Sequence, residues 1–312
     1  MSKSKRKIQI VEVGPRDGLQ NEKEIISVQN RIELIEKLIA TGAERIEGGA
    51  FVSEKWIPQM KGSADVLSGL ATRNPQIFQK KQISVLVPNE QGFHVVEKGP
   101  TKEIAFFASA SESFSQKNLN CSIDESLKRF EDFLPAAKQQ NYHIRGYLSV
   151  CFGCPFEGKV SEEKVVDLAH RLIQMGCFEV SIGDTIGIGH VGQVRSLFEK
   201  MQKVIPVTQI AGHFHDTRGQ ALANVLAAFE MGIDVFDSSL GGLGGCPYAP
   251  GSLGNVATED LVYMFHGLGI DTGYSLEKLI ETNRWMREIL GRPLPSRVSQ
   301  AAISISKSVS KN

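Results

Sequence analysis

The sequence predicts a single (β/α)₈ TIM barrel with an additional C-terminal helical segment. Short β-type runs alternate with amphipathic runs of helical spacing for nearly the whole length, and glycines follow several of the helical runs. Strands that alternate with helices pair in parallel, and eight such units are enough to close a sheet on itself. We expect one domain over residues 1–312 with a core of about 8–300; a doubly wound open sheet is the structural alternative.

The expected strands are rich in β-branched and aromatic residues, as strands usually are. They cover 8–13, 44–48, 82–87, 103–108, 144–151, 177–182, 207–214 and 234–239. Between the later strands, 161–175 and 218–231 repeat apolar residues at i, i+3, i+4 and i+7, which places them on one helix face. Gly42, Gly176 and Gly232 fit the left-handed position that ends a helix. Residues 257–268 give the eighth helix, and 275–290 an added one.

The composition is that of an ordinary soluble protein and excludes several classes of function. The 35 basic residues balance 35 acidic ones, so no overall field attracts nucleic acid or an anionic membrane. No apolar stretch approaches the roughly 18–20 residues of a membrane span. The basic N-terminus passes into the first strand without a signal-peptide apolar region, which favours a cytoplasmic protein.

The cysteines favour reduced thiols over a disulfide scaffold. They number five, an odd count spread over a long chain: Cys121, Cys151, Cys154, Cys177 and Cys246. Cys151 and Cys154 form C-x-x-C, but Pro155 follows them and no second pair completes a zinc site, so we expect a structural role.

Catalytic groups of such barrels lie after the C-terminal ends of strands. After the first strand, Arg16 and Asp17 stand side by side in the glycine-rich loop 12–20. The carboxylate can ligate a hard cation, and the guanidinium can stabilise an oxyanion. A turn with a solvated ion pair is the alternative.

At the end of the seventh strand, His213 and His215 are two residues apart. Strand periodicity places both imidazoles on one side and Phe214 on the other, toward the helices. Two histidines and an oxygen ligand suit a divalent cation with positions left open for substrate. A lone histidine would more often be a core residue; this spacing favours a metal.

The third candidate is the glycine-rich stretch 241–255, which follows the eighth strand. It lacks the Lys-Ser/Thr of a phosphate-binding P-loop. Asn255 could supply a neutral oxygen to the metal. Cys246 could be a proton donor or a substrate-facing lid group, since an ordinary thiol is mostly protonated at neutral pH; a small packing residue is the alternative.

Several long motifs, in chain order over roughly residues 8–300, closely resemble those of the 3-hydroxy-3-methylglutaryl-CoA lyase family. They are VGPRDGLQNEK (13–23), FVSEKWIPQM (51–60), ASESFSQKNLNCSIDES (110–126), GCPFEG (153–158), GDTIG (183–187), GHFHDTRGQALAN (212–224) and GGLGGCPYAPGSLGNVATEDLVYM (241–264). The combination of HxHDT with GGCPYAxGxxGN makes the match highly specific.

The resemblance implies metal-dependent cleavage of 3-hydroxy-3-methylglutaryl-CoA to acetyl-CoA and acetoacetate with Mg²⁺ or Mn²⁺, in leucine breakdown, by a homodimer. Its site residues are carried over position by position. The metal ligands would be Asp17, His213, His215 and Asn255; the catalytic residues Arg16, Asp17 and Cys246; and the residues that support substrate or the metal shell Arg16, Gln20, Glu47, Asp184 and Thr185. Asp17 is also the preferred proton acceptor, with a histidine as the alternative.

Three departures from the family pattern bear on the acyl substrate or the lid. Gly48-Gly49-Ala50 replaces a segment with hydroxyl side chains, Phe214 replaces a small residue, and Pro250 replaces a lysine. None touches an implied metal ligand. The alternatives to this function are a related metal-dependent lyase or aldolase for another hydroxyacyl-CoA or hydroxy acid, a condensing synthase of the same group, and a non-catalytic metal- or CoA-binding barrel.

Overall fold

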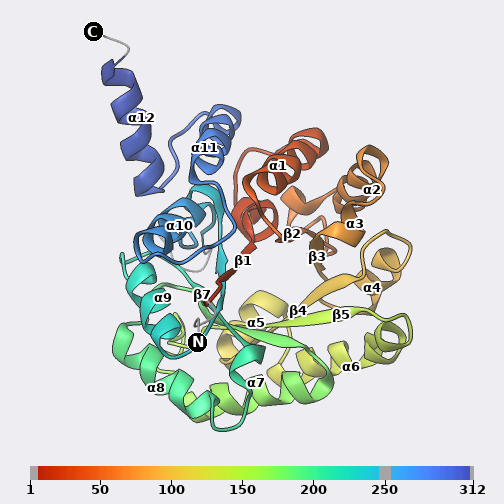
Figure 1. The fold of residues 1–312 in the computed structure, drawn as a ribbon. Coiled ribbons are helices and arrows are strands. Elements are labelled where there is room, and N and C mark those ends of the chain that lie inside the picture. Colours follow the sequence, from red (N-terminus) through yellow and green to blue (C-terminus); the bar gives the residue numbers. More distant parts are fainter. Residues whose placement is uncertain (1–5, 246–253, 310–312) are drawn as a thin grey trace, which may run out of the picture.

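The protein forms a closed barrel of eight parallel strands in a computed structural model that describes residues 6–245 and 254–309 (Figure 1). Each strand pairs with its neighbours in chain order, and β1 pairs with β8 to close the ring. The strands are β1 (Gln9–Glu12), β2 (Arg45–Ala50), β3 (Gln82–Leu86), β4 (Glu103–Ser109), β5 (His143–Ser149), β6 (Glu179–Asp184), β7 (Ile210–Phe214) and β8 (Val235–Ser238). The predicted barrel is confirmed, and the open sheet is excluded.

Helices surround the barrel, and two more follow at the C-terminus (Figure 1). They are α1 (Val28–Thr41), α2 (Ser63–Arg73), α3 (Ile77–Lys80), α4 (Glu90–Val96), α5 (Glu112–Leu119), α6 (Ile123–Gln139), α7 (Glu162–Met175), α8 (Val191–Met201), α9 (Ala221–Glu230), α10 (Thr258–Gly267), α11 (Leu276–Leu290) and α12 (Arg297–Val309). Within the described ranges, none of them is both long and apolar enough to cross a bilayer.

Local sequence signals fix the ends of these helices. The Ser122 and Ser161 hydroxyls accept the backbone N–H of the third helical residue of α6 and α7, which satisfies a donor that has no partner inside the helix. Gly42, Gly176 and Gly232 have φ of 111°, 117° and 101°, the left-handed backbone that glycine adopts without a Cβ clash.

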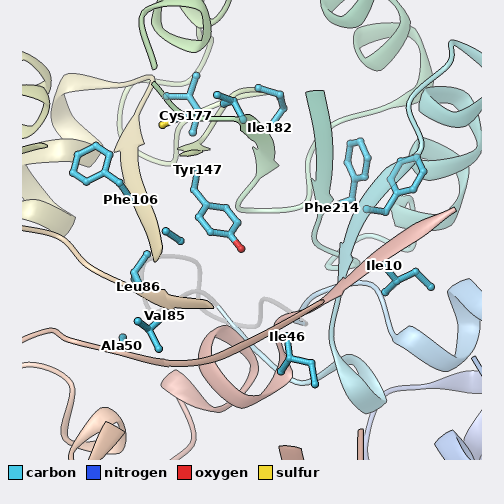
Figure 2. Close-up of a cluster of buried hydrophobic side chains, with 14 of the residues drawn as sticks. Ile10, Ile46, Ala50, Val85, Leu86, Phe106, Tyr147, Cys177, Ile182 and Phe214 are labelled. Atoms are coloured by element: carbon cyan, nitrogen blue, oxygen red, sulfur yellow. The ribbon is translucent and has the colours of Figure 1, made fainter. Parts of the chain in front are cut away.

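The main apolar core lies between the strands and the surrounding helices. Figure 2 shows Phe106, Ile46 and Phe214 on the outer side of their strands, whereas Tyr147 points into the space that the strands enclose. Phe106 stacks on Phe130 of α6 with ring centroids 4.5 Å apart. Phe214 is 1% exposed and packs toward Phe152, which agrees with its expected outward direction. Apolar residues therefore anchor the helices to the strands, and a separate small apolar cluster is formed by Val11, Val13, Ala211 and Val235.

Three details differ from the sequence-based expectation. The seventh strand begins at Ile210, because Val207–Gln209 form a 3₁₀ turn after Pro206. The sixth strand runs to Asp184 rather than ending at 182, since its pairing with β7 continues to Phe214. A second C-terminal helix, α12, follows α11 and projects from the barrel in Figure 1.

Candidate metal and active site

A single π-helical turn, η1 (Gly14–Gly18), follows β1 and carries Arg16 and Asp17. A Cβ on Gly14 would lie 2.6 Å from Glu12 Oε1, so the chain can make this close approach only with glycine. The buried Glu12 carboxylate holds the turn, since it accepts the Gly14 N–H at 2.8 Å and the Leu240 N–H at 2.9 Å. The first-strand loop is thereby tied to the segment after β8.

Two carboxylates fix the guanidinium of Arg16. Its Nε donates to Glu47 Oε2 at 2.7 Å, and its Nη1 to Asp17 Oδ1 at 2.7 Å. Arg16 is 7% exposed; burial alone would lower its pKa, but the charges of Glu47 and Asp17 outweigh burial and raise it. Arg16 is therefore a fixed cation at the mouth of the barrel, and the solvated ion pair considered above is excluded.

His213 of β7 and His215, directly after the strand, converge as the strand alternation predicts. His213 Nε2 and His215 Nε2 lie 3.1 Å apart, and both rings are buried. Asp17 joins them, and one ligand atom from each of the three residues lies within 4.8 Å of the others. Residues from opposite ends of the chain thus surround one point, which is the arrangement that a divalent cation requires.

Asn255 reaches the same point because the segment after the glycine-rich stretch pairs with the end of β7. Its Nδ2 donates to Asp17 Oδ2 at 2.8 Å, and its buried Oδ1 has no partner among the described residues. An unpaired buried carbonyl oxygen beside a carboxylate and two imidazole nitrogens is suited to a divalent cation. The residues present therefore fit the metal that the fold family implies.

The pKa values of Asp17 and His215 show that neither side chain holds an extra proton at neutral pH. Burial would raise the pKa of Asp17, but Arg16 and both histidines lower it to about 2. Burial, together with His213, lowers the pKa of His215 to about 4. At neutral pH, Asp17 is therefore ionised and His215 is uncharged with a lone pair available.

The buried, uncharged state of His215 predicts a pH effect on stability. An imidazole with a pKa of about 4 when folded and 6.5 when unfolded stabilises the fold fully above pH 6.5. That contribution is lost as the pH falls toward 4, and the difference between the two pKa values corresponds to at most about 3 kcal/mol. Glutamine does not titrate, so only the wild type should lose this contribution as the pH falls from 6.5 toward 4. We therefore expect the difference in unfolding free energy between the metal-free wild type and His215→Gln, measured by urea denaturation, to become smaller over this range. A difference that stays constant with pH would contradict this.

The predicted substrate residues occupy different places around the site. Gln20 and Thr185 line a cavity of about 710 Å³ together with Arg16, Asp17 and both histidines. Glu47 does not line this cavity, and its Oε2 instead accepts a hydrogen bond from Arg16 Nε. Asp184 is not among the lining residues, because its carboxylate accepts the Ile188 and Gly189 N–H at 3.0 and 2.9 Å. Its geometry is that of a residue that shapes the loop after β6.

Apolar side chains also line this cavity. Leu86, Phe107 and Phe114 contribute apolar surface, and the 81% exposed Trp56 also lines the cavity. Apolar surface thus lies in the same cavity as the candidate metal residues, together with polar side chains such as Lys117 and Arg129, which suits an acyl chain that carries a polar reacting group.

The departure at 48–50 does not open this cavity. A Cβ on Gly48 would meet Ile83 and Ile35 on the helical side of β2, and one on Gly49 would lie 2.7 Å from Ser63 Oγ. Neither glycine lines the cavity. The expected loss of hydroxyl contacts with substrate at these positions therefore lacks a structural basis. Cys246 and Pro250 lie outside the described residues.

Tyr147 and Asp237 are among the polar residues inside the barrel that the sequence patterns did not single out. Tyr147 lines the cavity and donates its hydroxyl to Glu47 Oε2 at 3.3 Å. Asp237 accepts a hydrogen bond from His213 Nδ1 at 3.0 Å. Both lie within the expected strands 144–151 and 234–239, where the alternation of inward-facing positions would have pointed to them.

Comparison with known proteins gives similarity over nearly the whole chain. A profile of the family described as HMGL-like matches residues 7–286. A Bos taurus protein named hydroxymethylglutaryl-CoA lyase, mitochondrial, is 49% identical over 300 residues, 96% of this chain and 91% of the relative. A Pseudomonas aeruginosa protein, named 3-hydroxy-3-isohexenylglutaryl-CoA/hydroxy-methylglutaryl-CoA lyase, is 48% identical over 96% of this chain and 98% of its own.

A solved structure shares the fold and contains bound ligands. It is described as an HMG-CoA lyase from Acinetobacter baumannii in complex with coenzyme A and 3-methylmalate. It superposes with a TM-score of 0.91 at 36% identity, and the match covers 96% of this chain and 97% of that one. The similarity therefore extends over both the barrel and the cavity at its mouth.

Proposed function

This chain belongs to the HMGL-like family, and from that premise we propose that it cleaves 3-hydroxy-3-methylglutaryl-CoA to acetyl-CoA and acetoacetate. The observation that carries the proposal is the convergence of Asp17, His213 and His215 beside Arg16 at one end of the cavity. Relatives at 48–49% identity over most of the chain, both named as lyases for this substrate, support it.

A divalent cation, Mg²⁺ or Mn²⁺, is part of the proposal. Asp17, His213, His215 and Asn255 Oδ1 would hold it, and carboxylate, imidazole and amide ligands accept either ion. When bound, it supplies Lewis-acid chemistry that makes a tertiary hydroxyl easier to deprotonate. Because its pKa of about 2 makes Asp17 a weak base, we propose it first as a ligand and only second as the proton acceptor.

Arg16 stabilises the negative charge that develops as the carbon–carbon bond breaks. Its guanidinium is held by Glu47 and Asp17 before substrate arrives, so it need not reorganise during the reaction. Tyr147 supports the same arrangement through Glu47. Cys246 stays a proposed proton donor or lid residue.

The partner implied is a small acyl-CoA. Assembly as a homodimer, a role in leucine breakdown and residence in the cytoplasm stay proposals; the relatives named above include a mitochondrial and a bacterial protein. A second substrate has a specific observation behind it. The phenylalanine-lined wall would accommodate a longer 3-alkyl group, as the name of the Pseudomonas aeruginosa relative suggests for that protein.

A direct assay tests the proposal. We expect the chelator-treated chain to leave 3-hydroxy-3-methylglutaryl-CoA intact, and added Mg²⁺ or Mn²⁺ to restore acetoacetate release, measured with a coupled dehydrogenase. The same assay with the 3-isohexenyl analogue measures the tolerance of the apolar wall. Turnover of another acyl-CoA alone would reject the substrate, and a chain that binds metal without cleaving any of them would be a binding protein.

A further inference from the structure

A chain of buried charged side chains crosses the barrel interior and ends at the histidine pair. It begins with Arg45, whose Nη2 lies 2.9 Å from Glu179 Oε1. Arg145 Nε contacts the same oxygen at 2.6 Å, and Arg145 Nη2 lies 2.8 Å from Asp237 Oδ1. Asp237 Oδ2 then contacts His213 Nδ1 at 3.0 Å. The four charges alternate in sign.

The register of neighbouring strands places these charged side chains next to one another. Arg145 of β5 pairs with Glu179 of β6, and His213 of β7 pairs with Asp237 of β8. The Arg145, Glu179 and Asp237 residues are 3%, 3% and 1% exposed. Charges taken out of water require opposite charges and good geometry, because an unpaired buried charge is strongly destabilising. Each group in the interior is therefore held in one position by the next.

The last contact determines which nitrogen of His213 carries its proton. An ionised carboxylate can only accept hydrogen bonds, so the 3.0 Å contact requires a proton on His213 Nδ1. The Nε2 atom of the neutral ring then has its lone pair directed toward His215 and Asp17. In the metal-free site, the 3.1 Å contact between the two rings can form only with His215 Nε2 as donor.

We propose that Asp237 is a positioning residue that holds His213 as the Nδ1–H tautomer, with Nε2 free for the cation, and that Arg145 fixes which carboxylate oxygen does so. This inference rests on the proposed metal site and deepens it. Arg145 Nη2 forms an ion pair with Oδ1 at 2.8 Å without hydrogen-bond geometry, and Ser181 Oγ donates to Oδ2 at 2.7 Å beside His213. Carboxylates that orient a ligating histidine raise metal affinity in the same way elsewhere.

The position of Arg145 makes Asp237→Asn a directional test. An amide nitrogen facing Arg145 would bring two donors together at 2.8 Å, so the Asn oxygen should face Arg145 instead. The amide N–H then faces His213 Nδ1, which must become the acceptor. The proton of His213 moves to Nε2, where it occupies the position of the cation.

Two measurements on the metal-free chain test this. In Asp237→Asn, Mn²⁺ affinity, measured by titration with electron paramagnetic resonance, should fall about 10–100-fold. In histidine-labelled wild type, ¹⁵N correlation spectra should show His213 protonated at Nδ1, and in the variant at Nε2. His213→Gln assigns the signal among the seven histidines. The wild-type spectrum requires no variant to fold, so an Nε2–H tautomer there would overturn the proposal by itself.

Ser181→Ala is the matched control. It removes a hydrogen bond from the same Asp237 oxygen but keeps the carboxylate, so Mn²⁺ affinity should stay within about threefold and His213 should keep Nδ1–H. An equal loss of affinity in Ser181→Ala would show that interior packing, rather than the tautomer, determines the affinity, and would overturn the proposal. If wild type binds no Mn²⁺, the proposed metal site fails, whereas the tautomer measurement still decides this inference.

Discussion

Replacing His213 with alanine is expected to abolish both cation binding and turnover. The change removes one of three ligand atoms that lie within 4.8 Å of one another, and the site keeps one imidazole beside Asp17. A bound cation contributes several kcal/mol to stabilisation of the developing charge, so its loss should lower kcat/KM by at least about 10³-fold. Calorimetric titration with Mn²⁺ and the acetoacetate assay measure the two effects separately.

His143→Ala is the matched control, because this histidine lies at the start of β5 at the other end of the barrel, with its side chain 68% exposed. Its substitution should leave Mn²⁺ affinity and turnover within about twofold. If His213→Ala bound Mn²⁺ as tightly as wild type, the ligand assignment would be wrong, whatever happened to turnover.

The barrel could be predicted because its signals are local. Alternating strand and helix patterns and helix-ending glycines each act over a few residues, and they all specify the same fold. The convergence of the two histidines could be predicted for the same reason, since strand alternation alone places His213 and His215 on one side. Asp17 and Asn255 were candidate oxygen ligands from their loop positions, and the resemblance assigned them to the same metal. Only the pairing of His215 with Asn255 explains why an asparagine so late in the chain reaches an aspartate near its start.

The interior of the barrel could not be predicted in this way. Asp237 and Arg145 lie in strands that the sequence predicts, but their partners depend on the register of neighbouring strands. Likewise, the expected sixth strand ended at residue 182, whereas β6 continues to Asp184. The contacts of Asp184 with the loop after β6 could therefore not be predicted. Where one polar residue is satisfied by another more than 20 positions away, spacing in the sequence carries no information about the pairing.

The second large effect is expected for Arg16→Gln, which should keep the cation and lose turnover. Glutamine removes the charge that stabilises the developing oxyanion, and the loss of one such donor lowers kcat by about 10²–10³, equivalent to about 3–4 kcal/mol. Mn²⁺ affinity should change by no more than a few-fold, because Arg16 provides no ligand atom and its removal frees an Asp17 oxygen from an ion pair. Single-turnover kinetics and Mn²⁺ titration on the same preparation measure both quantities.

Arg16→Lys separates charge from geometry. Lysine keeps the positive charge that the buried Glu47 requires, but a single ammonium cannot contact Glu47 and Asp17 as the guanidinium fork does. Its kcat should therefore lie between those of wild type and Arg16→Gln, with Mn²⁺ affinity retained. Loss of the cation in both variants would mean that Arg16 acts by holding Asp17 in place rather than by stabilising charge on the substrate. Measuring kcat and Mn²⁺ affinity in the same variant distinguishes these two roles. A variant that still binds the cation but has a lower kcat has lost charge stabilisation on the substrate.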